Sequence, residues 1–205
     1  MSGRSIVRTQ RGAAVALLFL LVVLVPTAAR ATDAEEAFTK GTKILSLQMG
    51  GGAQNGIETP NSGITFLNFT PRLSYLPFDP FGQSWYKVAL EPGLEGWVQY
   101  YMGPQQAAAG GLKTVGRLHA LGFGWFVPYL ELTAGAGATG LDLPESKSTF
   151  TFILEGGAGF SIFVKPDLAF TVGYRFQHMS NGNTSKPNKG YEADSGTIGL
   201  SYFFK

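Results

Sequence analysis

The chain of 205 residues has a net formal charge of only +2, contains no cysteine, and combines 28 glycines with 13% aromatic and 15% charged residues. Soluble globular domains average about 25% charged residues, so this composition does not suit a soluble helical protein and is typical of strands that face lipid. The absence of cysteine excludes disulfides, a cysteine nucleophile and a cysteine-ligated metal site.

Residues 1–31 have the three parts of a secretory signal peptide. Arginines at positions 4, 8 and 11 precede an apolar run of thirteen residues from Ala13 to Val25, Pro26 ends the run, and Ala29-Arg30-Ala31 fits the cleavage pattern. A spanning helix needs about 20 apolar residues, so we predict cleavage and not an uncleaved anchor. Removal lowers Lys plus Arg from 16 to 12 against 14 Asp plus Glu, and the net charge becomes −2. No nucleic-acid partner is therefore expected.

The remainder of the chain predicts a β-barrel. Residues 32–41 are expected to form a short periplasmic segment, and residues 42–205 the barrel itself. From Lys43 onward, segments of about ten residues alternate between apolar and polar side chains, which is the pattern of transmembrane β-strands. The alternating segments are 43–50, 64–75, 86–100, 114–123, 127–137, 150–162, 170–180 and 192–204. We therefore predict an all-β fold, an eight-stranded antiparallel up-and-down transmembrane barrel of the outer-membrane type.

The lengths of the connections predict how this barrel is oriented. Four links are long and polar, 51–63, 102–113, 138–148 and 181–190, whereas the links between them are mostly short and contain proline. Long outer loops and short periplasmic turns are typical of barrels in the bacterial outer membrane. The end of segment 170–180 is therefore expected at the cell exterior.

The strand positions opposite the apolar face carry charges of both signs. They are Arg72, Lys87, Arg117 and Arg175, with Glu91, Glu95, Glu131 and Glu155. Buried charges must be paired, and a barrel of about eight strands is just wide enough to be filled by side chains, so we expect a packed polar interior. A soluble lipocalin-like barrel would carry these charges outside. His119 shares the inner face and is expected to be a hydrogen-bonded interior residue.

An unusual polar group is predicted on the lipid-facing side of the last hairpin. His178 and Ser180 share one strand face with Phe176, and Glu192 lies at the same end and on the same face of the following strand. An acid, an imidazole and a hydroxyl are the groups that activate a serine nucleophile. An ionisable side chain facing lipid indicates function. The alternative is that the strand ends reach the head-group zone of the membrane, where polar and charged side chains cost little free energy.

The sequence around these residues resembles a known family. Residues 178–182 read His-Met-Ser-Asn-Gly, residues 186–190 read Lys-Pro-Asn-Lys-Gly, and Glu192 follows. This segment of about fifteen residues resembles the active site of the PagL family, the outer-membrane lipid A 3-O-deacylases. The resemblance implies an eight-stranded barrel with its catalytic site on the outer wall near the outer leaflet.

The resemblance also implies a role for each matching residue. Ser180 would attack the ester that links a 3-hydroxyacyl chain to the glucosamine of lipid A, with His178 as general base and then acid. Glu192 would orient the imidazole and stabilise its charge. The oxyanion hole, or support for the loop, would come from Asn181, Gly182 and Asn188. The enzyme would then be a serine esterase of a Gram-negative outer membrane, with lipopolysaccharide as its substrate.

Three alternatives stay open on the sequence alone. The chain could be a non-enzymatic structural or adhesive barrel, or a small-molecule porin, and Asp142 with Glu145 could bind divalent cations that bridge lipopolysaccharide. No cofactor and no catalytic metal are expected, because two histidines without cysteine do not support a zinc site. Whether the barrel forms a homodimer is left open by the sequence.

Overall fold

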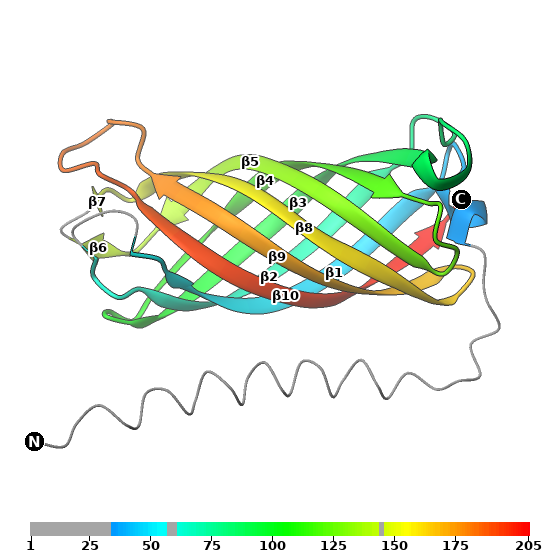
Figure 1. Ribbon diagram of the computed structural model, residues 1–205. Helices are drawn as coiled ribbons and strands as arrows, with labels where there is room; N and C mark the ends of the chain where they lie inside the picture. Colours follow the sequence, from blue (N-terminus) through cyan, green and yellow to red (C-terminus); the bar gives the residue numbers. More distant parts are fainter. Residues whose placement is uncertain (1–33, 57–60, 144–145) are drawn as a thin grey trace, which may run out of the picture. The chain divides into compact units, whose positions relative to one another are not determined.

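The computed structural model describes residues 34–56, 61–143 and 146–205, which belong to one compact unit. The predicted signal peptide lies outside the described residues. Eight strands close into an antiparallel barrel in the order β1-β10-β9-β8-β5-β4-β3-β2, so that the first and last strands pair (Figure 1). The predicted fold class is therefore confirmed.

The bounds of the elements agree with the predicted alternation. The barrel strands are β1 (Lys43–Gln54), β2 (Thr65–Tyr75), β3 (Val88–Gly103), β4 (Ala107–Ala120), β5 (Phe126–Thr139), β8 (Phe150–Lys165), β9 (Leu168–Ser180) and β10 (Tyr191–Phe204). The link between β5 and β8 contains a small hairpin of β6 (Asp142–Leu143) and β7 (Ser146–Lys147), and two short 3-10 helices are η1 (Ala34–Phe38) and η2 (Ser84–Tyr86). None of the helices in the described residues is both long and apolar enough to pass through a membrane.

Side chains alternate between the outer wall and the interior along each barrel strand. On β1, Leu45 and Leu47 are about half exposed, whereas Ser46 and Gln48 are almost fully buried. The other strands repeat the pattern, so leucine, phenylalanine, tyrosine and methionine side chains cover the outside of the barrel. A soluble monomer rarely exposes so large an apolar surface, and a lipid environment accounts for it.

Paired charges fill the middle of the barrel. Arg175 donates from Nη1 to Glu95 Oε1 at 2.8 Å and from Nε to Glu131 Oε1 at 2.7 Å. The second oxygen of Glu131 accepts from Arg117 Nε at 2.7 Å. These side chains are almost completely buried, and removal of one partner from such a pair costs about 3–5 kcal/mol. The interior is thus a tightly coupled polar core.

The prediction that Lys87 lies in the barrel interior is wrong. Lys87 lies between η2 and β3, is partly exposed, and forms an ion pair with Glu35 of η1. Lys113 takes the interior place: its Nζ lies 2.6 Å from Glu155 Oε2 and 2.9 Å from Glu95 Oε1.

Lys113 is missed because β4 starts seven residues before the predicted segment 114–123. The run Ala-Ala-Ala-Gly-Gly at 107–111 falls in the predicted link 102–113, but it pairs along its whole length with β3. Gly111 also lies opposite Gly137 of β5, and a Cβ at Gly111 would come 2.1 Å from the carbonyl oxygen of Ala136. Small residues permit this close approach of two strands, so tertiary pairing overrides their weak strand propensity.

The end of the barrel that holds the C terminus is closed by η1 (Figure 1). Phe38 is fully buried, with its ring centroid 4.7 Å from that of His119 and 5.2 Å from that of Phe203. His119 Nε2 is hydrogen bonded to Glu91 Oε2 at 2.6 Å, which confirms the prediction that His119 is an interior residue. The opposite end carries the loop between β9 and β10 and the β6–β7 hairpin (Figure 1).

Candidate active site

The hairpin of β9 and β10 brings His178 and Glu192 together on the outer wall. The two residues are direct partners in the antiparallel register, so their side chains project to the same side of the sheet. His178 Nδ1 is hydrogen bonded to Glu192 Oε1 at 2.7 Å. The His178 side chain is 37% exposed and that of Glu192 only 11%. A largely buried carboxylate therefore orients an accessible imidazole, whose Nε2 is left for a proton transfer.

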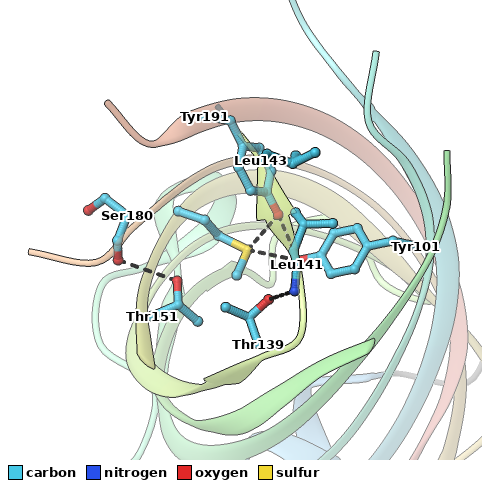
Figure 2. Close-up of a pocket in the computed structure, with 8 residues that line it drawn as sticks. Tyr101, Thr139, Leu141, Leu143, Thr151, Ser180 and Tyr191 are labelled. Atoms are coloured by element: carbon cyan, nitrogen blue, oxygen red, sulfur yellow. Dashed lines mark hydrogen bonds between the residues drawn. The ribbon is translucent and has the colours of Figure 1, made fainter. Parts of the chain in front are cut away.

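Ser180 is the last residue of β9 and lies two positions after His178 on the same strand face. Its carbonyl oxygen accepts a hydrogen bond from Thr151 Oγ1 at 3.3 Å, and its hydroxyl points away from the small pocket between Thr151, Met179 and Tyr191 (Figure 2). In the described part of the chain, no hydrogen bond joins the Ser180 hydroxyl to His178. Catalytic hydrogen bonds are often long or poorly aligned before substrate binds.

Gly190 packs against both of these side chains. A Cβ built on this residue would lie 3.1 Å from His178 Cε1, 3.1 Å from Ser180 Cβ and 2.7 Å from the carbonyl oxygen of Met179. Its φ of +70° is also in the region that side chains disfavour. A side chain at this position would press on the imidazole and the serine together. Gly190 belongs to the sequence motif, but this packing role was not predicted from it.

The loop from 181 to 190 is held by the asparagines that flank it. The Asn181 backbone N–H donates to Asn188 Oδ1 at 2.9 Å, and Asn181 Nδ2 donates to the Ser185 carbonyl at 3.0 Å. Thr184 Oγ1 donates to the Asn181 carbonyl at 2.8 Å, and Asn181 is fully buried. Ser185 Oγ also donates to the carbonyl of Lys147 in β7. Asn181 and Asn188 therefore fix the conformation of the loop beside Ser180.

Gly182 lies at the turn directly after this point. Its φ is +63°, and a Cβ there would come 2.7 Å from Cε2 of Phe152, an outward-facing residue of β8. Phe152 is the register partner of Ser180, so the ring covers one side of the turn. Among the described residues, the Gly182 N–H has no hydrogen-bond acceptor, which distinguishes it from the N–H of Asn181.

A layer of interior side chains supports the same strand ends from below. Met179, between His178 and Ser180, accepts a hydrogen bond on Sδ from Tyr191 Oη at 2.8 Å. Tyr191 Oη lies 2.8 Å from Tyr101 Oη, and the two rings point toward each other inside the barrel (Figure 2). All three residues are buried. Tyr191 directly precedes Glu192, so this layer couples the strand of the histidine to the strand of the carboxylate.

An apolar groove runs over the outer wall beside His178. Its volume is about 610 Å³, and its floor contains small residues that leave room between larger neighbours. The outward-facing residues that line it are Thr114, Gly116, Leu132, Ala134, Leu154, Gly156, Phe176 and His178. Leu154 is the register partner of His178, and so the groove begins directly next to the imidazole. Its shape and chemistry suit a hydrocarbon chain.

The predicted divalent-cation pair is only partly described. Asp142 is exposed on β6, and Glu145 lies outside the described residues. Over the described ranges 34–56, 61–143 and 146–205, no group of three or more His, Asp or Glu side chains is arranged to hold a metal ion.

These features define a class of protein, an eight-stranded barrel of the outer-membrane type with a polar site on its lipid-facing wall. The sequence model of the family "Lipid A 3-O-deacylase (PagL)" matches residues 70–201. The chain belongs to this PagL family of lipid A deacylases, which are enzymes of the outer membrane.

Solved structures agree with the fold. The crystal structure of the outer membrane enzyme PagL is similar with a TM-score of 0.53 and 19% identity, over 76% of this chain and 97% of that chain. Neisserial surface protein A (NspA) is similar with a TM-score of 0.55 and 16% identity, over 80% of this chain and 98% of that chain. The sequence matches none of the curated proteins. At these identities the similarity to solved structures supports only the barrel fold. The assignment to a class of enzymes rests on the family match.

Proposed function

We propose that Ser180, His178 and Glu192 form a catalytic triad that hydrolyses an ester-linked 3-hydroxyacyl chain of lipid A. The observation that carries this proposal is the 2.7 Å hydrogen bond between His178 Nδ1 and Glu192 Oε1 on the lipid-facing wall. A histidine fixed in this way has one tautomer, with the proton on Nδ1, and its Nε2 is a base. Ser180 is the neighbouring hydroxyl on the same strand face.

The reaction has two steps. In the first, Ser180 Oγ attacks the ester carbonyl carbon and His178 Nε2 takes the hydroxyl proton. The bond from the carbonyl carbon to the sugar oxygen breaks, the imidazolium gives its proton to that oxygen, and the acyl chain is left on Ser180. In the second step a water molecule, deprotonated by His178, attacks the acyl-serine and releases the carboxylic acid and the free serine. Glu192 stabilises the imidazolium in both steps.

The oxyanion of each tetrahedral intermediate needs a donor near Ser180. We assign this role to the backbone N–H of Gly182, because that of Asn181 is already bonded to Asn188 Oδ1. Asn181 and Asn188 then act as supports of the loop. A single oxyanion donor contributes a factor of about 10²–10³ in kcat, so the conformation of this loop matters for rate.

The position of the site explains how it meets its substrate. Lipid A is anchored by several acyl chains in the outer leaflet, so its ester bonds can approach only the outer wall of a barrel. The apolar groove beside His178 offers a binding place for one of these chains. Transport to the outer membrane requires export, and we propose that residues 1–31 are the cleaved signal peptide that directs it.

Mass spectrometry of lipid A tests the function. Cells of a Gram-negative host that express the wild-type barrel should yield lipid A that has lost the mass of one hydroxyacyl chain. The variant Ser180→Ala, inserted at the same level, should leave lipid A unchanged. Unmodified lipid A from a correctly inserted wild-type barrel would reject the esterase and favour the structural or adhesive alternative.

A further inference from the structure

The exposed lysines at the outer end of the barrel lie on one side of it, next to the candidate active site. The loop between β9 and β10 contains Lys186 and Lys189, and the link between β5 and β8 contains Lys147. The other two outer links, 55–64 and 104–106, contain neither lysine nor arginine. Positive charge at this end of the barrel is therefore gathered beside the candidate active site and not spread around the rim.

Hydrogen bonds hold the two lysine-bearing segments together at the same end of the barrel (Figure 1). Ser185 Oγ donates to the carbonyl of Lys147, and the Lys147 N–H donates to the Pro187 carbonyl at 3.4 Å. Lys186 lies between Ser185 and Pro187 in the chain, so the backbones of Lys147 and Lys186 are neighbours. Because these contacts use only the backbone of Lys147, its side chain is not occupied by them.

The positive charge of these lysines is not neutralised by the loop itself. All three are exposed, and within the described residues none of them forms an ion pair with a carboxylate. An acid, Asp142, is the register partner of Lys147 in the β6–β7 hairpin. The loop of Lys186 and Lys189, residues 181–190, contains no aspartate or glutamate. Ammonium groups in such a setting are suited to bind an anion, and phosphate is an anion that lysine commonly binds.

Lys189 is close enough to Ser180 to contact a group on the sugar that carries the ester. It directly precedes Gly190, on which a Cβ would lie 3.1 Å from Ser180 Cβ. Since successive Cα atoms are about 3.8 Å apart, the Cα of Lys189 lies within about 8 Å of Ser180 Cβ. A phosphate on the same sugar is about six bonds of about 1.5 Å from the ester carbonyl carbon, and the lysine side chain adds five bonds of that length. The two distances are compatible.

The candidate active site lies between an apolar and a basic region. The groove beside His178 begins at the level of the imidazole. The lysine-bearing loop continues the hairpin beyond Ser180 to the outer end of the barrel. An ester bound at Ser180 therefore has an apolar surface on one side and lysines on the other. This arrangement matches an amphiphile with a hydrocarbon chain and a negatively charged head group.

We propose that Lys147, Lys186 and Lys189 bind a phosphate group on the sugar that carries the cleaved ester, and that they make the enzyme select phosphorylated substrates. This rests on the proposed function, because the distance to the phosphate is counted from Ser180. The lysines hold the head group while the triad acts on the ester, so they contribute to substrate binding and not to the chemical step.

The test compares two synthetic glucosamine esters with the same 3-hydroxyacyl chain, one with a phosphate on the sugar and one without, in neutral detergent micelles. Wild-type enzyme at low ionic strength should have a kcat/KM about tenfold higher for the phosphorylated ester, mainly through KM, since each exposed lysine–phosphate pair contributes a factor of about two to five. The preference should fall at about 1 M salt, where the Debye length is about 3 Å.

The variant with Lys147→Gln, Lys186→Gln and Lys189→Gln should hydrolyse both esters at the wild-type rate for the unphosphorylated ester. The same three positions changed to arginine keep the charge and should keep the preference. Lys165→Gln, an exposed lysine at the opposite end of the barrel, is the matched control for the loss of one positive charge.

A further arm separates the phosphate of the substrate from that of a neighbouring lipid. Phosphatidic acid is added to micelles that contain the unphosphorylated ester. The rate on this ester should not rise. A rise to the rate of the phosphorylated ester would reject selection by the phosphate of the substrate and would assign the lysines to contact with the membrane surface.

Two other results would overturn the phosphate site while the esterase stands: equal wild-type rates on the two esters, or an unchanged preference in the triple glutamine variant. Ser180→Ala should abolish hydrolysis of both esters. A folded wild-type barrel that hydrolyses neither ester, and leaves lipid A intact, would instead reject the proposed function and the phosphate site with it.

Discussion

Glutamates lie beside basic side chains both in the interior of the barrel and on its outer wall, but their hydrogen bonds differ between the two regions. Inside, Glu131 accepts from both Arg117 and Arg175, so each of its oxygens has a charged donor. On the outer wall, Glu192 accepts from His178 through Oε1, whereas its buried Oε2 has no partner among the described residues. Glu131, with both oxygens bonded to arginines, stabilises the fold. Glu192, with one oxygen bonded, orients the imidazole of His178 and leaves its other ring nitrogen available for proton transfer.

The largest expected effect is on the outer wall. Glu192→Gln should lower kcat about 10⁴-fold, because the amide stabilises the wrong imidazole tautomer and no positive charge. The free energy of unfolding should fall by only about 1 kcal/mol, because glutamine keeps the shape of the side chain and an oxygen that can accept from His178 Nδ1. Hydrolysis of lipid A by purified enzyme, followed by mass spectrometry, gives the rate. A rate close to that of the wild type would remove Glu192 from the mechanism.

The interior should respond in the opposite way. Glu131→Gln removes the carboxylate partner of Arg117 and one of the carboxylate partners of Arg175, which keeps Glu95. The free energy of unfolding should fall by about 3–5 kcal/mol, because Arg117 is left as a buried charge without its pair. Denaturant titration of the barrel in detergent measures this loss. Barrels that remain folded should hydrolyse lipid A at a rate near that of the wild type. A large drop in rate per folded molecule would show that the two regions are not separate.

Gly190→Ala should lower kcat by an intermediate amount, because it disturbs the candidate active site. The new methyl group must displace His178, Ser180 or the backbone by several tenths of an ångström, and misplacement by about 1 Å can cost a factor of about 10² in rate. The expected result is a loss of about 10²-fold in kcat with a smaller change in KM. Gly196→Ala is the control, since a Cβ there meets nothing within 4 Å and the residue does not line the groove. Equal rates for the two variants would contradict the role of Gly190.

The smallest effect is expected where the two regions meet. Tyr191→Phe removes the hydroxyl that lies between Met179 Sδ and Tyr101 Oη. A lost hydrogen bond of this kind costs about 1 kcal/mol, which should appear as a loss of stability and an approximately fivefold lower kcat. Thermal unfolding and initial rates on the same preparation measure both. An unchanged kcat would mean that the interior layer stabilises the hairpin without positioning the triad.

Much of the fold follows from the alternation of side chains. The period of two determines the number of strands and which face of each is apolar, and it also brings Glu192 to the face of His178. The sequence misses Lys113 because alanine and glycine carry no alternation signal, so only the pairing with β3 and β5 reveals where β4 starts. Lys87 is misassigned for another reason, since it directly precedes the first residue of β3. The layer of Tyr101, Met179 and Tyr191 was not predicted. Tyr101 and Tyr191 lie outside the predicted strands, and side-chain contacts across the barrel depend on its closed geometry.

The most direct test of the central claim is to find the residue that becomes acylated. A phosphonate ester with a long alkyl chain, which reacts only with an activated serine, should modify the folded barrel, and peptide mass spectrometry should locate the adduct on Ser180. Glu192→Gln should react far more slowly under the same conditions. Modification of another residue, or no modification of a barrel that still deacylates lipid A, would contradict a serine nucleophile on the outer wall.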